Sequence, residues 1–146
     1  MKPIWIIVAL LAGSFLPIQA GLNARLGKAI ESPIQASLVS FIVGGLALLS
    51  YILIARQQVS LVGLKSAPVY LYVGGVLGAF TITGIVLAFP KIGPAMTFGL
   101  VVTGQMVISV LLDQFNILVS QQQSINTWKV FGIALIVTGV IVIRKF

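Results

Sequence analysis

Residues 33–55 read PIQASLVSFIVGGLALLSYILIA and contain no charged side chain. About 20 mainly apolar residues, each adding about 1.5 Å of helical rise, cross the hydrocarbon core of a bilayer. This stretch is therefore long enough to span a membrane. The whole chain has the same character, since 59% of its 146 residues are hydrophobic and 8% are charged, and its mean hydropathy is +1.16. A soluble domain carries about 25% charged residues, so we predict an integral membrane protein.

Four further apolar stretches have a similar length. Lipid offers the backbone no hydrogen-bond partners, and these lengths suit helices rather than membrane strands of about 9 to 11 residues. The first stretch also resembles a secretory signal sequence, but we interpret it as a membrane span. The expected fold is all-α, a single transmembrane domain over residues 1–146 with five helices. We place the helices at about 3–21, 33–55, 69–89, 94–112 and 128–144.

Proline marks the start of three of these spans. A proline at the first helical position is favourable because its missing N–H would have no partner there. The pairs that open spans in this way are Ser32-Pro33, Ala67-Pro68 and Gly93-Pro94. Pro17 differs because it lies late in the first span, where we expect it to bend the helix.

Positive charge is nearly balanced between the two sides of the predicted helices. The side of the N-terminus carries Lys2, Arg56, Lys65 and Lys129. The other side carries Arg25, Lys28, Lys91, Arg144 and Lys145. Because Lys and Arg prefer the cytoplasm, balance predicts insertion in both orientations, and hence an antiparallel homodimer of ten helices. The alternative is a single orientation, in which Arg25 and Lys28 hold the first loop in the cytoplasm.

The side chains present exclude several classes of chemistry. The chain has no cysteine and no histidine, and its carboxylates are Glu31 and Asp113. Disulfides, thiol nucleophiles and most transition-metal sites are thereby excluded, and the groups for acid–base catalysis are lacking. We therefore expect that the protein is not an enzyme and that it binds no cofactor and no metal ion. The net charge of +7 indicates anchoring to anionic lipid headgroups, and no basic, aromatic-rich patch suggests nucleic acid.

Polar groups inside the spans are the candidate binding residues, because their burial in a membrane is costly. Gln19 and Asn23 share a helix face if the first helix continues past residue 21. Gln105, Ser109 and Asp113 repeat at the same spacing and form a polar stripe. This stripe either joins packed helices through hydrogen bonds or lines a substrate cavity. For Asp113 the simpler interpretation is a solvated charge at the end of its helix.

Hydroxyl and aromatic side chains are weaker candidates. The hydroxyls of Ser37, Ser40, Thr81 and Thr83 can bond to carbonyls of their own helices. Among them, Ser40 is a candidate for the cavity. Aromatic residues provide either cavity walls or interfacial belts; Phe41 is the candidate for a wall, while a belt is the expected place of Trp5 and Tyr70.

Glycines form a third pattern. Gly74, Gly75 and Gly78 include a GxxxG motif, and Gly44-Gly45 lies in the middle of the second span. Small residues let membrane helices approach closely, so we expect close packing within the fold. Gly132 and Gly139 are one heptad apart on the last span and are candidates for a dimer interface.

At three places the sequence resembles the YdcZ-like family of small bacterial inner-membrane proteins, which belongs to the drug/metabolite transporter superfamily. The segments are PIQAGLNARLGKAIESPIQASLVSFIVGG (17–45), GQMVISVLLDQF (104–115) and GIALIVTGVIVI (132–143). The residues in register with the family pattern are Gln19, Asn23, Ser32-Pro33, Phe41, Gly44, Gly104-Gln105 and Asp113. The resemblance implies a five-helix half-transporter, paired with an inverted second half in the bacterial inner membrane.

Two departures limit what the resemblance implies. The family tends to have a histidine and a glycine after the aspartate, where this chain has Gln114 and Asn116. The last span also looks like the dimerisation helix of small multidrug-resistance transporters, but the glutamate that those exporters carry in their first helix is missing. The sequence therefore supports neither proton titration after Asp113 nor the export of multidrug cations.

The function expected from the sequence is transport of a small solute, with export as the favoured direction, by alternating access of an inverted-topology dimer. The second half is a copy of this chain or an oppositely oriented paralogue. The predicted substrate-binding residues are Gln19, Asn23, Ser40, Phe41, Gln105, Ser109 and Asp113. A cavity without a deep carboxylate favours a neutral or anionic polar solute over a cation. A dual-topology ion channel and a structural membrane partner subunit are the alternatives.

Overall fold

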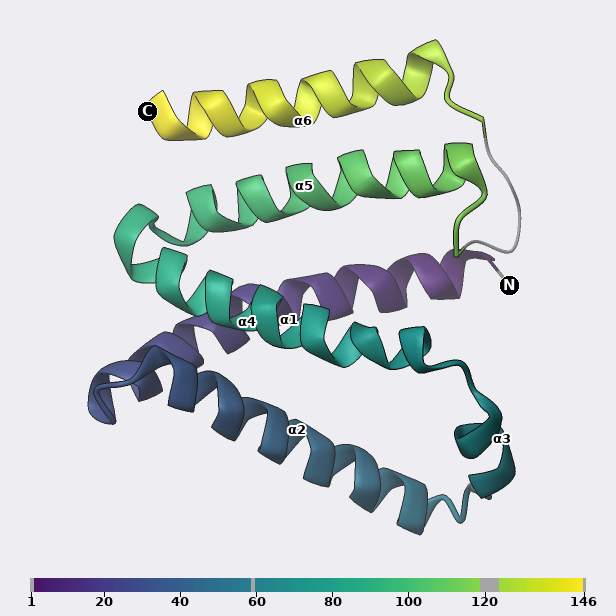
Figure 1. The fold of residues 1–146 in the computed structure, drawn as a ribbon. Helices are drawn as coiled ribbons and strands as arrows, with labels where there is room; N and C mark the ends of the chain where they lie inside the picture. The colour runs from purple at the N-terminus through teal and green to yellow at the C-terminus, as the bar shows by residue number, and fades with distance from the viewer. Residues whose placement is uncertain (1, 59, 119–123, 146) are drawn as a thin grey trace. The chain divides into compact units, whose positions relative to one another are not determined.

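The computed structural model describes residues 2–58, 60–118 and 124–145, with only the backbone considered for Lys2 and Leu64. In this part of the chain, five helical segments are long and apolar enough to cross a membrane. The predicted five-helix architecture is thereby confirmed, while the ten-helix homodimer stays a prediction. The elements, drawn in Figure 1, are α1 (Lys2–Ala29), α2 (Pro33–Ile54), α3 (Leu61–Ser66), a 3₁₀ helix (Val69–Tyr72), α4 (Val73–Ile92), α5 (Pro94–Phe115) and α6 (Thr127–Lys145).

The first helix is longer than the sequence predicted. The predicted span ended at residue 21, because the residues after it are less apolar. The helix itself continues to Ala29. The added segment is rich in Ala, Leu, Arg and Lys, which favour helix, and the helix stops only before Glu31, whose φ is 55°. Arg25 and Lys28 were expected in the connection after the first span, but they lie in the last two turns of α1.

The predicted helix starts are confirmed at Pro33 and Pro94. Before α2, the Oγ of Ser32 accepts a hydrogen bond from the backbone N–H of Gln35 at 3.3 Å. Before α5, Gly93 has a φ of 79°, a conformation that glycine adopts without steric cost. The third span opens after Pro68 as a 3₁₀ turn.

One short helix was not predicted. The Oγ of Ser60 caps α3 by accepting a hydrogen bond from the N–H of Gly63 at 3.1 Å. With six residues, α3 is too short to cross a bilayer. It connects α2 to the 3₁₀ turn that leads into α4.

The chain divides into two compact units, and the first contains residues 1–91. Here α1 and α2 meet near the turn that joins them and diverge away from it (Figure 1). At Gly27 a side chain would lie 3.2 Å from the Cα of Pro33, so only glycine allows this approach without movement of the backbone. The buried side chains of the first unit are Ala20, Asn23, Ala36, Ser37, Ile85 and Val86.

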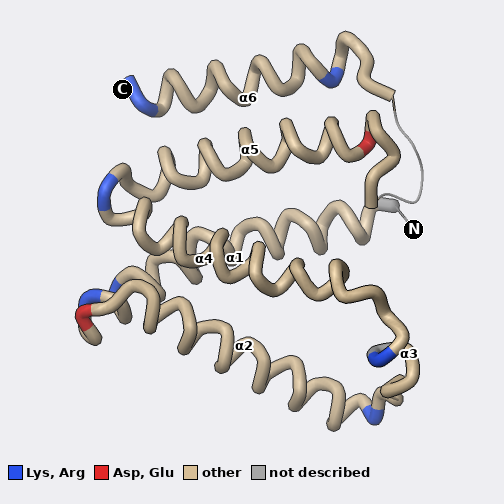
Figure 2. The backbone as a smooth tube through the Cα atoms, viewed as in Figure 1, with Lys and Arg blue, Asp and Glu red and all other residues tan. Residues whose placement is uncertain are grey.

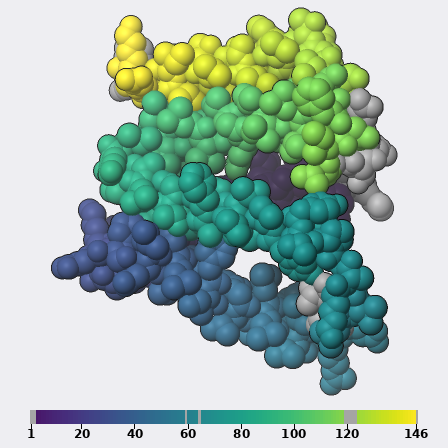
Figure 3. All heavy atoms as spheres, viewed as in Figure 1, coloured from purple at the N-terminus to yellow at the C-terminus, as the bar shows by residue number. Residues whose placement is uncertain are grey.

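The second unit contains residues 92–146. Its helices α5 and α6 lie side by side, as Figures 1 and 3 show. At Gly99 of α5, an added Cβ would lie 2.8 Å from a methyl carbon of Val140 of α6. The Val140 side chain thus packs directly on the backbone of α5 and is buried, as is Thr97.

Charged residues lie towards the ends of the helices in Figure 2 and leave the central turns without charge. Within the chain itself, between 6% and 11% of the residues in the most apolar part of each span are buried. Large apolar side chains therefore remain exposed along every span. This surface is suited to lipid or to helices of another chain.

Candidate functional site

Three polar side chains from α1 and α2 meet at one hydroxyl group. The side-chain N–H of Asn23 donates to the Oγ of Ser40 at 3.2 Å, and that of Gln19 donates to the same oxygen at 3.4 Å. A hydroxyl oxygen has two acceptor positions, so Ser40 accepts both bonds. We call Gln19, Asn23 and Ser40 the amide–hydroxyl cluster.

The cluster exists because α1 continues past residue 21. Gln19 and Asn23 are four residues apart, so on one continuous helix they share a face, as the sequence predicted on that condition. Near the turn, the close approach of Gly27 to Pro33 brings this face against α2. Asn23 is consequently only 6% exposed, whereas Gln19, one turn further from the connection, is exposed.

Two of the other hydroxyls, Ser37 and Thr81, bond to carbonyls of their own helices, as the sequence predicted. Ser37 donates to the carbonyl of Pro33 at 3.0 Å, and Thr81 donates to that of Leu77 at 2.8 Å. These bonds remain within one helix. Ser40 differs because it joins two helices.

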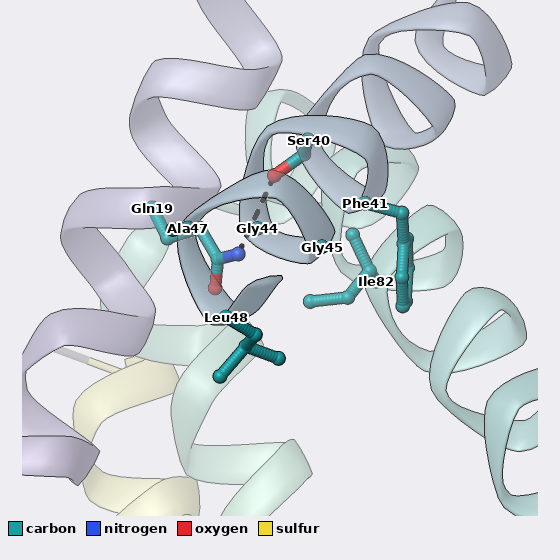
Figure 4. Close-up of a pocket in the computed structure, with 8 residues that line it drawn as sticks. All are labelled: Gln19, Ser40, Phe41, Gly44, Gly45, Ala47, Leu48 and Ile82. Atoms are coloured by element: carbon teal, nitrogen blue, oxygen red, sulfur yellow. Dashed lines mark hydrogen bonds between the residues drawn. The ribbon is translucent and has the colours of Figure 1, made fainter. Parts of the chain in front are cut away.

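A cavity of about 610 Å³ opens beside the cluster within the first unit. Figure 4 shows Gln19 on one side of the α2 backbone and Phe41 with Ile82 on the other. The Oε1 of Gln19 points away from Ser40 in this view. The volume is within the range of about 300 to 1,000 Å³ typical of small-molecule sites. The lining residues are Gln19, Ser40, Phe41, Gly44, Gly45, Ala47, Leu48 and Ile82.

A second, much smaller cavity of about 10 Å³ adjoins Asn23. Gln19 and Ile82 line both cavities, so the small one is next to the large one. This volume is at the lower limit for a single water molecule, which also needs polar partners. The amides of Gln19 and Asn23 supply such partners.

The aromatic wall of the cavity, the Phe41 ring, lies near a glycine of α4. A Cβ at Gly78 of α4 would lie 3.5 Å from the Phe41 ring, which is ordinary van der Waals contact. Phe41 is still 42% exposed, so part of its ring remains available to the cavity. A methyl group would fit at Gly78, so its contact with Phe41 does not require glycine, and close packing through the GxxxG motif stays a prediction.

The other glycines of the pattern were expected to pack closely within the fold, and this expectation was wrong. Within its own unit, a Cβ added to any of them would meet no described atom within 4 Å. Gly44 and Gly45 line the cavity. An interface through Gly132 and Gly139 stays a prediction. The open positions are Gly44, Gly45, Gly74, Gly75, Gly132 and Gly139.

The polar stripe on α5 belongs to the second unit. Gln105 and Ser109 are exposed, and their place in a substrate site stays a prediction. The Oδ2 of Asp113 lies 3.3 Å from the Nζ of Lys129 on α6, with both side chains partly buried. This ion pair and the bond from the N–H of Ile125 to the Oε1 of Gln114, at 2.7 Å, join the neighbouring ends of α5 and α6.

The sequence interpretation missed most of the cavity wall. Ala47, Leu48 and Ile82 are ordinary apolar residues, and their part in the site depends on how α2 and α4 face each other. Gly44-Gly45 was noticed but assigned to packing. Among the described residues that line the cavity, none carries a charge, and the described chain contains no cluster of metal-binding side chains.

The five apolar helices define a multi-pass integral membrane protein, and its cavity is lined by neutral groups. Residues 4–142 match the family described as "Putative inner membrane exporter, YdcZ". The chain belongs to this family and is an inner-membrane protein. Export is a transport function and not an enzyme class. Neither a curated protein nor a solved structure shows significant similarity to the chain.

Proposed function

We propose that the chain exports a small solute by alternating access, as one half of an antiparallel homodimer. The observation that carries this proposal is the amide–hydroxyl cluster at the edge of the cavity between α1, α2 and α4. Polar groups that face an open cavity inside apolar helices are suited to a solute that must be recognised and then released. The family description supports export as the direction.

The dimer is proposed on the basis of charge and exposure. Nearly balanced positive charges favour insertion in both orientations, and the apolar face with Gly132 and Gly139 is open to a second copy. Two inverted halves can open a shared cavity to either side by rocking. In this arrangement Gln19, Ser40 and Phe41 contact the solute, and Asn23 holds Ser40 in place.

Single cysteines test the orientation, since the chain has none of its own. Ala29→Cys and Gln57→Cys place an uncharged label site at opposite ends of α2 without altering the charge balance. Cells are treated with a thiol reagent that cannot cross the inner membrane, and permeabilised cells give the full signal. We expect labelling of about half of the protein at each position. Full labelling at one position and none at the other would exclude the antiparallel homodimer.

Ser40→Ala and Ser50→Ala form a matched pair for testing transport. Ser50 lies on the same helix, but its hydroxyl bonds to the carbonyl of Leu46 at 2.8 Å and it does not line the cavity. Vesicles containing the purified protein are loaded with a small-molecule extract of bacterial cells, and mass spectrometry follows the solutes that leave.

We expect one or a few solutes to leave vesicles that contain the wild type or Ser50→Ala, and not those that contain Ser40→Ala. Equal behaviour of the two variants would refute the site. Unitary currents in a planar bilayer would instead establish a channel, because alternating access is limited by motions of microseconds to milliseconds.

A further inference from the structure

The cavity has one feature that transport of a small solute does not by itself explain. Gly44 and Gly45 lie inside α2, where glycine is less favourable than alanine. At Gly27 and Gly78 a neighbouring group lies within contact distance of an added Cβ, but at Gly44 and Gly45 nothing does. Packing within the described part of the first unit therefore does not require these glycines. Both line the cavity, where the missing side chains leave the α2 backbone exposed; we call this stretch the Gly44–Gly45 strip.

Aromatic and aliphatic side chains border this strip. Phe41 and Ile82 lie on one side of it in Figure 4, and Leu48 follows it along α2. An exposed aromatic ring beside backbone without side chains leaves room for a planar apolar group to pack on the ring, because aromatic rings pack in offset or edge-to-face arrangements. A side chain at either glycine would occupy the place of such a group.

The polar end of the cavity offers both donors and acceptors. The amides of Gln19 and Asn23 each use one N–H for Ser40, and an amide has two N–H groups and a carbonyl oxygen. The Oε1 of Gln19 is turned away from Ser40 (Figure 4). Donors and acceptors side by side complement another amide, or a hydroxyl group. None of the described lining residues is charged, so a charged solute would lose its hydration without a counter-charge.

We propose that the substrate class is an uncharged, amphipathic solute with a planar ring and a carboxamide or hydroxyl group. The ring lies on the Gly44–Gly45 strip beside Phe41, and the polar group binds Gln19 and Ser40. This inference rests on the proposed function, because it assigns a substrate class to the same cavity.

Benzamide, benzoate, benzamidinium and cyclohexanecarboxamide test the inference as probes. The first three share a planar shape and differ in charge, and the fourth has the amide without the planar ring. Binding to the full chain in lipid nanodiscs is measured by saturation-transfer NMR, with empty nanodiscs as the blank for partition into lipid.

We expect benzamide to bind at least about tenfold more tightly than the two charged probes, because a buried charge without a partner costs more than a hydrogen bond contributes. Cyclohexanecarboxamide should also bind more weakly than benzamide. Equal binding of a charged probe would overturn the assignment of an uncharged solute. Equal binding of cyclohexanecarboxamide would overturn the requirement for a planar ring.

Gly45→Leu and Gly13→Leu are the matched variants for locating the probe. Gly13 lies inside α1, has nothing within 4 Å of an added Cβ and does not line the cavity. We expect Gly45→Leu to abolish benzamide binding and Gly13→Leu to retain it, with unchanged thermal unfolding of both. Gly45→Ala, which has the better helix propensity, should weaken binding without loss of stability. Benzamide binding that survives Gly45→Leu would overturn the inference.

The vesicle experiment separates this inference from the proposed function. If benzamide fails to bind while solutes still leave in a Ser40-dependent manner, the cavity is the transport site and the substrate class is wrong. If benzamide binds beside Gly45 but no solute leaves, the cavity is a binding site for this class of ligand, while the transport proposal falls and with it the assignment of this class as the substrate.

Discussion

The bond between Asn23 and Ser40 predicts a measurable coupling between α1 and α2. Asn23→Ala, Ser40→Ala and the double variant form a thermodynamic cycle that isolates this bond, since the separate effects of each truncation cancel. The donor is 6% exposed and its nitrogen lies 3.2 Å from the hydroxyl oxygen. A second cycle with Gln19→Ala isolates the longer bond of 3.4 Å from an exposed donor.

The expected magnitudes follow from geometry. Hydrogen bonds between membrane helices contribute about 0.6 kcal/mol on average and at most about 1.7 kcal/mol. Most N–H···O distances lie at about 2.7 to 3.2 Å, so the Asn23 bond is at the limit of this range and the Gln19 bond is beyond it. We expect a coupling of about 0.5 to 1 kcal/mol for the Asn23–Ser40 cycle. The Gln19–Ser40 cycle should give a smaller value.

The assay is reversible unfolding in mixed micelles, followed by circular dichroism as the fraction of denaturing detergent rises. Ser50→Ala is the control, because its hydroxyl bonds within its own helix. In a cycle with Asn23→Ala it should show no coupling. A coupling near zero for Asn23 and Ser40, or a larger one for Gln19 and Ser40, would refute the arrangement of the cluster.

Three further substitutions test the packing of the two units by the same unfolding assay. In Gly99→Ala, overpacking against Val140 costs about 1 to 3 kcal/mol and helix propensity returns about 1 kcal/mol, so the variant should range from neutral to about 2 kcal/mol less stable. Adding Val140→Ala should relieve the overpacking. A Gly99→Ala variant that gains the full helix-propensity term of about 1 kcal/mol would contradict the contact. Gly27→Ala should destabilise the α1–α2 turn, because its neighbour is backbone, and a more stable variant would argue against this close approach. Asp113→Asn should cost about 1 kcal/mol or less, and the exchange Asp113→Lys with Lys129→Asp should recover it; failure to recover would show that Asp113 acts through something other than this ion pair.

Much of the fold was predictable because lipid imposes helices and proline marks where they begin. Pro33 and Pro94 open α2 and α5 at the predicted residues. The end of α1 was not predictable from hydropathy, because Arg25 and Lys28 are unfavourable in lipid but favourable in a helix. The short α3 was also not predicted. Serine is common in loops, so the sequence does not show that the hydroxyl of Ser60 caps a helix.

The candidate site was predictable only in part. Spacing alone placed Gln19 and Asn23 on one face, but their common partner Ser40 lies on another helix. Its position depends on how closely α1 and α2 approach at Gly27, which no periodicity reveals. Glycine is a second example. It allows close packing at Gly27 but lines an open cavity at Gly45, and the sequence does not distinguish these two uses.

The position of Ser40 along α2 sets the depth of the cluster in the membrane. It is the eighth residue of a helix of 22 residues, so it lies about 5 Å from the middle of the helix along its axis, at about 1.5 Å per residue. In an antiparallel pair the two clusters would therefore lie at different depths, about 10 Å apart along the same axis. A solute would then pass from the amide–hydroxyl cluster of one copy to that of the other. A molecule longer than this separation would contact both clusters at once.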